Sequence, residues 1–145
     1  MPSVANILVA VDFSEASIHA LDEAIELASR FHARVVVCHA YRVSAIVAAI
    51  LGGSGELAEA IAAAAERELV NIIGSRSNRG VEVISVVRRG SPTEQIRTIA
   101  QEIGAGLIVL GAHEPRGLRG HWLQRKVATR LVQEKHVPVW SVCSA

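Results

Sequence analysis

Residues 107–118 constrain the fold of this chain more than any other stretch. Four apolar residues, 107–110, run into Gly111, and a short polar loop with a second glycine, Gly117, leads into a helical pattern. A continuous apolar run, rather than an alternating one, is typical of a parallel strand that is buried on both faces. In an open α/β sheet, ligands bind beyond the carboxyl ends of such strands. The stretch therefore predicts an α/β fold and directs the search for a site to the residues that follow 110.

Strand and helix patterns alternate along the whole chain. Apolar runs predict strands at 6–11, 34–40, 81–87, 107–110 and 137–142. Between them, apolar residues recur at i, i+3, i+4 and i+7, the spacing of one helix face, and predict helices after Ser14, over 56–73, over 91–103 and around 123–131. This alternation predicts an α/β protein with an open, mainly parallel five-stranded sheet and helices on both faces. A length of 145 residues fits a single domain, 1–145.

Composition excludes several classes of protein. The net charge of +1 argues against a nucleic-acid binder, which is usually strongly basic. We expect a cytoplasmic protein without a membrane segment, because no leader pattern opens the chain and no apolar run approaches 18 residues. The six histidines show no metal-binding spacing, so we expect no metal site. Cys38 and Cys143 are expected to be small buried hydrophobic residues, and no catalytic set is recognisable.

Three polar residues follow or end the first two strands. Ser14 is predicted to cap the first helix. Asp12 has two interpretations that remain open: an acceptor for the base or ribose of a ligand, or a turn residue that accepts hydrogen bonds from nearby amides. His39 is interpreted as a hydrogen-bonded core histidine. Further along, Ser91 and Glu94 have the spacing of a capping box, with Pro92 at the first helical position.

Two segments are predicted to lie at the edges of the structure. Strand 81–87 alternates, which suits an edge strand, and strand 137–142 contains Pro138, which cannot donate to a ladder. An apolar edge with Trp140 favours pairing with another chain. The segment 41–56 has no clear conformation, and its glycines at 52, 53 and 55 suit a hinge, since no Lys-Ser/Thr follows to make a phosphate-binding Walker motif.

The ordered set of these motifs resembles the universal stress protein family. The set comprises 11–14 (Val-Asp-Phe-Ser), 39–40 (His-Ala), 90–92 (Gly-Ser-Pro), 108–113 (Ile-Val-Leu-Gly-Ala-His) and 137–139 (Val-Pro-Val). The resemblance implies the strand order 3-2-1-4-5, a Rossmann-like sheet of the adenine nucleotide alpha hydrolase type. It also implies a homodimer formed through the last strand, with Val137, Val139, Trp140 and Val142 at the interface.

The ATP-binding branch of that family carries Gly-x-x-Gly, nine residues, and then Gly followed by Ser or Thr. This chain keeps Gly111, but Glu114 stands at the second glycine, and Gln124, Arg125 or Lys126 stand at the later positions. A carboxylate facing a triphosphate costs roughly 1 to 4 kcal/mol per charge pair at ~4 Å. Weak or absent ATP binding is therefore expected, while ATP or AMP stays a candidate ligand. The residues that would contact it are Ala10, Val11, Asp12, Ala40, Gly111, His113, Gly117, Arg125 and Lys126.

Three functional hypotheses follow. The first is a dimeric stress-response protein that acts by binding and regulation, with an unknown protein partner and without catalysis. The second is an adenine-nucleotide switch with slow ATP hydrolysis, which uses Asp12, Ala40, Gly111 and a helix start near 125. The third is an interaction module for anionic partners, based on the basic cluster at 116–130, although such a cluster more commonly forms a solvated helix face.

Overall fold

The computed structural model describes residues 4–53, 55–76, 78–112, 121–134 and 137–143, with the side chains of 121–126 left out. Five strands form one sheet in the order β3-β2-β1-β4-β5, and all four neighbouring pairs are parallel. The strands are β1 (Asn6–Ala10), β2 (Arg34–Tyr41), β3 (Val83–Arg89), β4 (Leu107–Ala112) and β5 (Val139–Cys143). The helices are α1 (Glu15–Phe31), α2 (Ala45–Ile50), α3 (Gly55–Gly74), α4 (Pro92–Ile103) and α5 (His121–Gln133). The predicted fold and strand order are confirmed.

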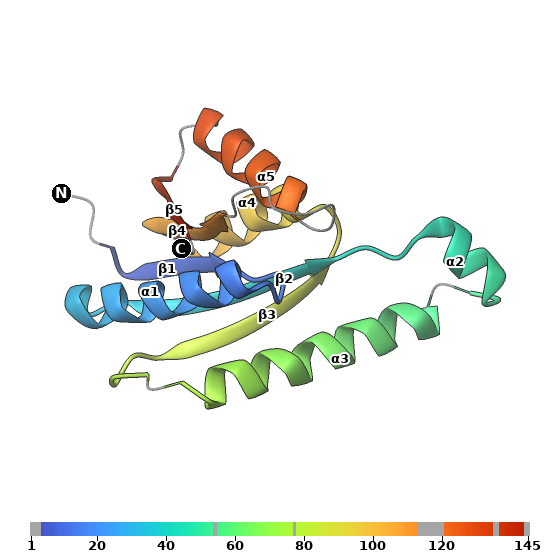
Figure 1. The fold of residues 1–145 in the computed structure, drawn as a ribbon, viewed down its shortest axis with the longest axis horizontal. Coiled ribbons are helices and arrows are strands. Elements are labelled where there is room, and N and C mark those ends of the chain that lie inside the picture. The colour runs from blue at the N-terminus through green and yellow to red at the C-terminus, as the bar shows by residue number, and fades with distance from the viewer. Residues whose placement is uncertain (1–3, 54, 77, 113–120, 135–136, 144–145) are drawn as a thin grey trace.

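The sheet separates two apolar cores, which makes a three-layer structure (Figure 1). On one face, Ile7 and Val9 of β1 pack with Leu21 and Ile25 of α1 and with Leu69 of α3. On the other face, residues of β1, β2 and β4 pack against residues of α4 and α5. The strand residues are Leu8, Val36, Cys38, Ile108 and Leu110, and the helix residues are Ile96, Ile99, Val127 and Leu131. Because side chains alternate across a strand, each central strand supplies both cores, which explains its continuous apolar sequence.

Helix α1 begins as its sequence predicts. Ser14 has extended backbone and its Oγ accepts a hydrogen bond from the amide of Ser17 at 3.2 Å. The helix ends at His32, which has a left-handed φ of 53°. The predicted cap at Ser14 is therefore confirmed.

The predicted capping box at Ser91 is only partly confirmed. Ser91 does occupy the N-cap position and Pro92 the first helical position, but the Ser91 hydroxyl makes no capping hydrogen bond. The helix nonetheless ends at Gly104 as predicted, since the left-handed φ of 62° there suits a residue without a Cβ. The fixed φ of Pro92 and the buried stripe of α4 define this helix without a side-chain cap.

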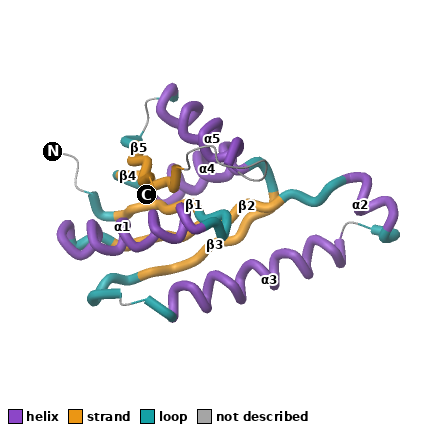
Figure 2. Tube along the Cα trace, viewed as in Figure 1, coloured by secondary structure: helices purple, strands orange, loops and turns teal. Residues whose placement is uncertain are grey.

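The edge strands differ in detail from their sequence patterns. β3 is an edge as expected, but it runs two residues further along the chain than predicted. β5 is the other edge, and it begins after Pro138, not around it. The carbonyl of Pro138 accepts a hydrogen bond from the amide of Ile108 at 2.9 Å, so the proline introduces the strand and loses no ladder bond. The ambiguous segment 41–56 contains helix α2, reached through the loop that leaves β2 (Figure 2).

Candidate ligand cleft at the carboxyl ends of the strands

A small cleft of about 60 Å³ opens where β1, β2 and β4 end, and we call it the carboxyl-end cleft. Its described lining comes from those three strands and from α4 and α5: Ala10, Val11, Asp12, Cys38, Ala40, Leu110, Pro92, Ile96 and Val127. The strand order reverses between β1 and β4, so the cleft lies at the topological switch point where ligands bind in such sheets. The structure therefore brings together four of the nine candidate nucleotide residues, namely Ala10, Val11, Asp12 and Ala40.

Asp12 is the acidic group among the described residues that line the cleft. Its Oδ1 accepts a hydrogen bond from the amide of Ser14 at 3.0 Å and another from the Ser14 hydroxyl. Its own amide donates to the Oγ of Ser17 at 3.3 Å. These contacts support the turn interpretation for Oδ1. No described protein group donates to Oδ2, so the ligand interpretation stays open for that oxygen.

Phe13 and His39 hold the turn between β1 and α1. The carbonyl oxygen of Val11 can only accept, so the Nδ1–H of His39 donates to it at 2.7 Å. Phe13 packs against the His39 ring with 4.5 Å between ring centroids and has a left-handed φ of 64°. The prediction of a hydrogen-bonded histidine is confirmed, although His39 is only half-buried. The role of Phe13 was not predicted, because no spacing in the sequence signals a left-handed turn at a phenylalanine.

The two cysteines lie in different environments. Cys38 is buried below the cleft, and burial raises the pKa of its thiol to about 12, which keeps it protonated and unreactive near neutral pH. Cys143 is exposed at the end of β5, so the prediction that both cysteines are buried is wrong for Cys143. Cys143 is the last residue of β5, beyond the part of this strand that packs against the cores.

Gly111 packs against a helix and is not part of the described cleft lining. A Cβ at this position would lie 2.5 Å from the main-chain carbonyl carbon and oxygen of Ala16. The backbone of α1 therefore approaches β4 directly at this glycine. Its neighbour Leu110 points to the opposite face and lines the cleft. Gly111 thus has a packing role that accounts for the absence of a side chain.

The remaining candidate nucleotide residues fall in or beside the loop after β4. His113 and Gly117, together with Glu114 and much of the basic cluster at 116–130, lie outside the described residues. Arg125 and Lys126 lie within α5, which begins at His121 and not near 125 as predicted. Only the first four amides of a helix lack intrahelical partners, so the amides of 125 and 126 are committed to the helix.

The expected interface residues are unequally accessible. Trp140 is 41% exposed, and Val137 and Val139 are half-buried against the core beneath α4 and α5. Val142 is buried in the core on the α1 side, so its side chain is not accessible to a partner, contrary to the prediction.

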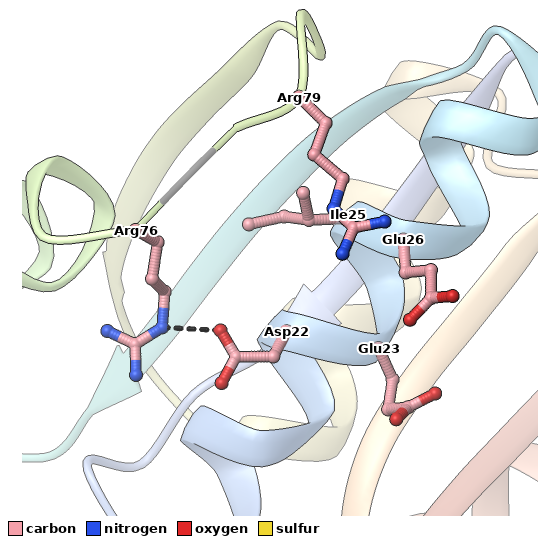
Figure 3. A pocket seen from close by; sticks show the side chains of 6 residues that line it. All are labelled: Asp22, Glu23, Ile25, Glu26, Arg76 and Arg79. Atoms are coloured by element: carbon pink, nitrogen blue, oxygen red, sulfur yellow. Dashed lines mark hydrogen bonds and ion pairs between the residues drawn. The ribbon is translucent and has the colours of Figure 1, made fainter.

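A second hollow, of about 250 Å³, lies between α1 and the loop after α3 (Figure 3). Arg76 Nε donates to Oδ1 of Asp22 at 2.7 Å across it. Arg79, with a left-handed φ of 52°, extends toward α1 from the same loop (Figure 3). The ion pair between Arg76 and Asp22 ties the loop to α1. Within the described part of the chain, no three His, Cys, Asp or Glu side chains gather as metal ligands, and no helix is long and apolar enough to cross a membrane.

Comparison with known proteins identifies the family. The sequence pattern of the universal stress protein family matches residues 4–142. The chain belongs to this family. A universal stress protein of Methanocaldococcus jannaschii is 30% identical over 134 residues, which cover 92% of this chain and 78% of the relative.

Solved structures of universal stress proteins share the whole fold. A family member from Burkholderia pseudomallei is 28% identical, with a TM-score of 0.74 and 98% of both chains covered. A universal stress protein from Archaeoglobus fulgidus, solved in complex with dAMP, is 24% identical, with a TM-score of 0.65, 97% of this chain covered and 99% of the other.

Proposed function

We propose that this universal stress protein acts in the stress response by binding and regulation, and that its carboxyl-end cleft holds the nucleoside part of an adenine nucleotide. The observation that supports this nucleotide site most strongly is that Asp12 and Ala40 line the same apolar cleft at the switch point of the sheet. Ala10, Leu110 and Val127 offer apolar surface to a flat base, and Oδ2 of Asp12 can accept a hydrogen bond from the base or ribose. The dAMP complex of the Archaeoglobus protein supports a mononucleotide as the ligand class.

The phosphate end of the site is proposed to be weak. Glu114 places a carboxylate where the ATP-binding branch has a glycine, and it would repel the phosphates. The amides of Arg125 and Lys126 bond within α5 and are not free to cradle a phosphate. A monophosphate is therefore expected to bind more tightly than a triphosphate.

Binding without turnover fits the described lining of the cleft. Hydrolysis needs a base positioned on a water molecule. Asp12 is the acid among the described lining residues. Its Oδ1 accepts from the amide and hydroxyl of Ser14, and its Oδ2 is the proposed acceptor for the nucleoside, so neither oxygen is assigned to a water molecule. Cys38, the thiol among the described lining residues, stays protonated near neutral pH because burial raises its pKa to about 12. We therefore favour a regulatory protein over a slow ATPase.

We further propose a homodimer formed through β5. This strand is at the edge of the sheet, and the described residues leave its outer side uncovered. Trp140, 41% exposed there, is the side chain best placed to contact a partner.

Isothermal titration with AMP, ADP and ATP tests the nucleotide proposal. The wild-type protein should bind AMP more tightly than ATP, and Asp12→Ala should weaken AMP binding.

Glu114→Gln removes the charge and keeps the side chain, whereas Glu114→Gly also opens the backbone, so the pair separates charge repulsion from steric obstruction of the phosphates. Glu114→Gly should improve ATP binding modestly. Adding Arg125→Gly and Lys126→Ser to that variant should improve ATP binding further. Glu59→Gln, an exposed change on α3, is the matched control.

Two outcomes contradict the proposal. Micromolar or tighter ATP binding by the wild type would favour the nucleotide switch with slow hydrolysis. If none of the three nucleotides binds, the cleft is not a nucleotide site. That result would favour the third hypothesis, an anionic partner recognised by the basic cluster at 116–130.

A further inference from the structure

Residues 43–53 and 55–65, which we call the arm, extend away from the body of the protein. They comprise α2 and the first half of α3. Figure 1 shows α2 and the adjoining end of α3 beyond the carboxyl end of β2, and none of the described helices or strands packs extensively against α2. The arm is outside the carboxyl-end cleft, and neither the proposed function nor the pairing of β5 uses it.

The apolar side chains of α2 are uncovered. Ile46 is 73% exposed and Ile50 is 76% exposed, with Val47 and Leu51 at 43% and 63%. α2 contains no buried residue. A helix of six residues is far shorter than the ~12–15 residues that an isolated helix needs in water. Its stability must therefore come from packing, which the described part of its own chain does not supply.

Helix α3 carries a second apolar stripe beside its buried face. Its buried residues are Ala58, Ala65, Leu69 and Ile72, of which Leu69 and Ile72 pack in the core shared with α1 and the sheet. Leu57, Ala60, Ile61 and Ala64 fall at i, i+3, i+4 and i+7 on a neighbouring face, with both alanines exposed and the other two half-buried. This is the pattern of a helix that packs against two neighbours. The small alanines leave room for the larger side chains of another helix.

Charge indicates what kind of partner fits the arm. Residues 43–55 carry no charge, and the acids of the arm, Glu56 and Glu59, fall outside the α3 stripe. A helix that lies on a membrane usually has Lys and Arg on its polar face, whereas α2 has only alanines and the N-cap Ser44 there. The partner surface is therefore expected to be apolar, uncharged and helical, with both large and small side chains.

We infer that the arm is a self-association surface, occupied by the arm of a second copy of this chain. In a twofold arrangement, the large side chains of α2 in one protomer pack on the alanine stripe of α3 in its partner, and the same contact forms twice. No like charges face one another in this pairing. It leaves β5 free, because β5 lies at the opposite edge of the sheet from β3, against which α3 packs.

Analytical ultracentrifugation in a Trp140→Glu background tests the arm without the β5 contact. This variant should still form dimers at micromolar concentrations. Adding Ile50→Glu should weaken the dimer by roughly tenfold or more, because a charge is placed in the centre of an apolar interface. Val70→Glu is the matched control, since Val70 is 63% exposed on α3 but lies outside the arm. Far-UV circular dichroism checks that each variant is folded.

A proximity measurement identifies the occupant. Pyrene attached at Ile46→Cys, in a Cys143→Ser background, should give excimer fluorescence that Ile50→Glu abolishes. Monomeric Trp140→Glu protein, absence of the excimer, or equal effects of Ile50→Glu and Val70→Glu would overturn the inference. Flotation of the wild type with phosphatidylcholine–phosphatidylserine vesicles, lost in Ile50→Glu, would overturn it in favour of a membrane partner.

Discussion

The carbonyl carbon of Ala16 lies 2.5 Å from where a Cβ on Gly111 would be. No ordinary side-chain contact is that short, and the group in the way is main chain that cannot rotate aside. The glycine that the sequence associates with a nucleotide loop is therefore required for packing α1 on β4. It would be required whether or not a nucleotide binds.

Gly111→Ala should destabilise the protein by about 1–3 kcal/mol or more, the usual cost of overpacking a core. Urea denaturation followed by circular dichroism measures it. Gly74→Ala is the control, because a Cβ there meets nothing within 4 Å, and it should change stability little. Equal stability of the two variants would mean that α1 moves away from β4 without cost.

Ser14 and Ser91 form a matched pair of N-cap residues. Ser14→Ala removes an acceptor for the Ser17 amide and should cost about 1 kcal/mol. Ser91→Ala removes a hydroxyl that makes no capping bond, so it should change the free energy of unfolding by less than about 0.5 kcal/mol. Denaturant titration compares them. A larger loss at Ser91 would show that its hydroxyl caps α4 in solution.

The two thiols should react at very different rates. Cys143 is exposed and should react readily with a disulfide reagent at pH 8, whereas Cys38 should react only when the protein unfolds. A Cys143→Ser variant isolates the buried thiol. Rapid labelling of Cys38 in folded protein would contradict this and show that the cleft opens enough for the reagent to reach the buried thiol.

The raised pKa of Cys38 also predicts a pH dependence of stability. The folded pKa of about 12 is above the ordinary value of 9.0, so the folded state holds this proton more tightly than the unfolded state does. The contribution is fully present below pH 9 and falls as the pH rises toward 12, by up to about 1.4 kcal/mol per pH unit. Comparing the wild type with Cys38→Ala over this range isolates the effect. Parallel pH profiles for the two proteins would contradict it.

Trp140 tests the proposed pairing of β5. In an Ile50→Glu background, which removes the arm contact, Trp140→Glu should halve the molar mass measured by light scattering, because it places a charge on the apolar edge. Val132→Glu, an exposed change on α5, should leave the mass unchanged. A wild type that already scatters as a monomer at micromolar concentration would exclude dimerisation through this strand.

The sequence by itself determined the fold and the position of Asp12 in the candidate site. Continuous apolar runs at β1, β2 and β4 can only be buried on both faces, so the parallel sheet and its two helical layers follow from their pattern. The position of Asp12 two residues after β1 likewise placed it at the carboxyl end of the sheet. These are local properties, and local spacing encodes them.

Only the tertiary structure decided what the other residues do. Gly111 is fixed by the approach of α1, which begins nearly a hundred residues earlier, and no spacing reveals such a contact. Val142 is buried because α1 covers its face of β5, whereas Cys143 is exposed at the end of that strand. The uncovered arm is apparent only once α2 is seen apart from the sheet. Each of these outcomes arises from contacts between segments distant in sequence, which periodicity along one segment does not specify.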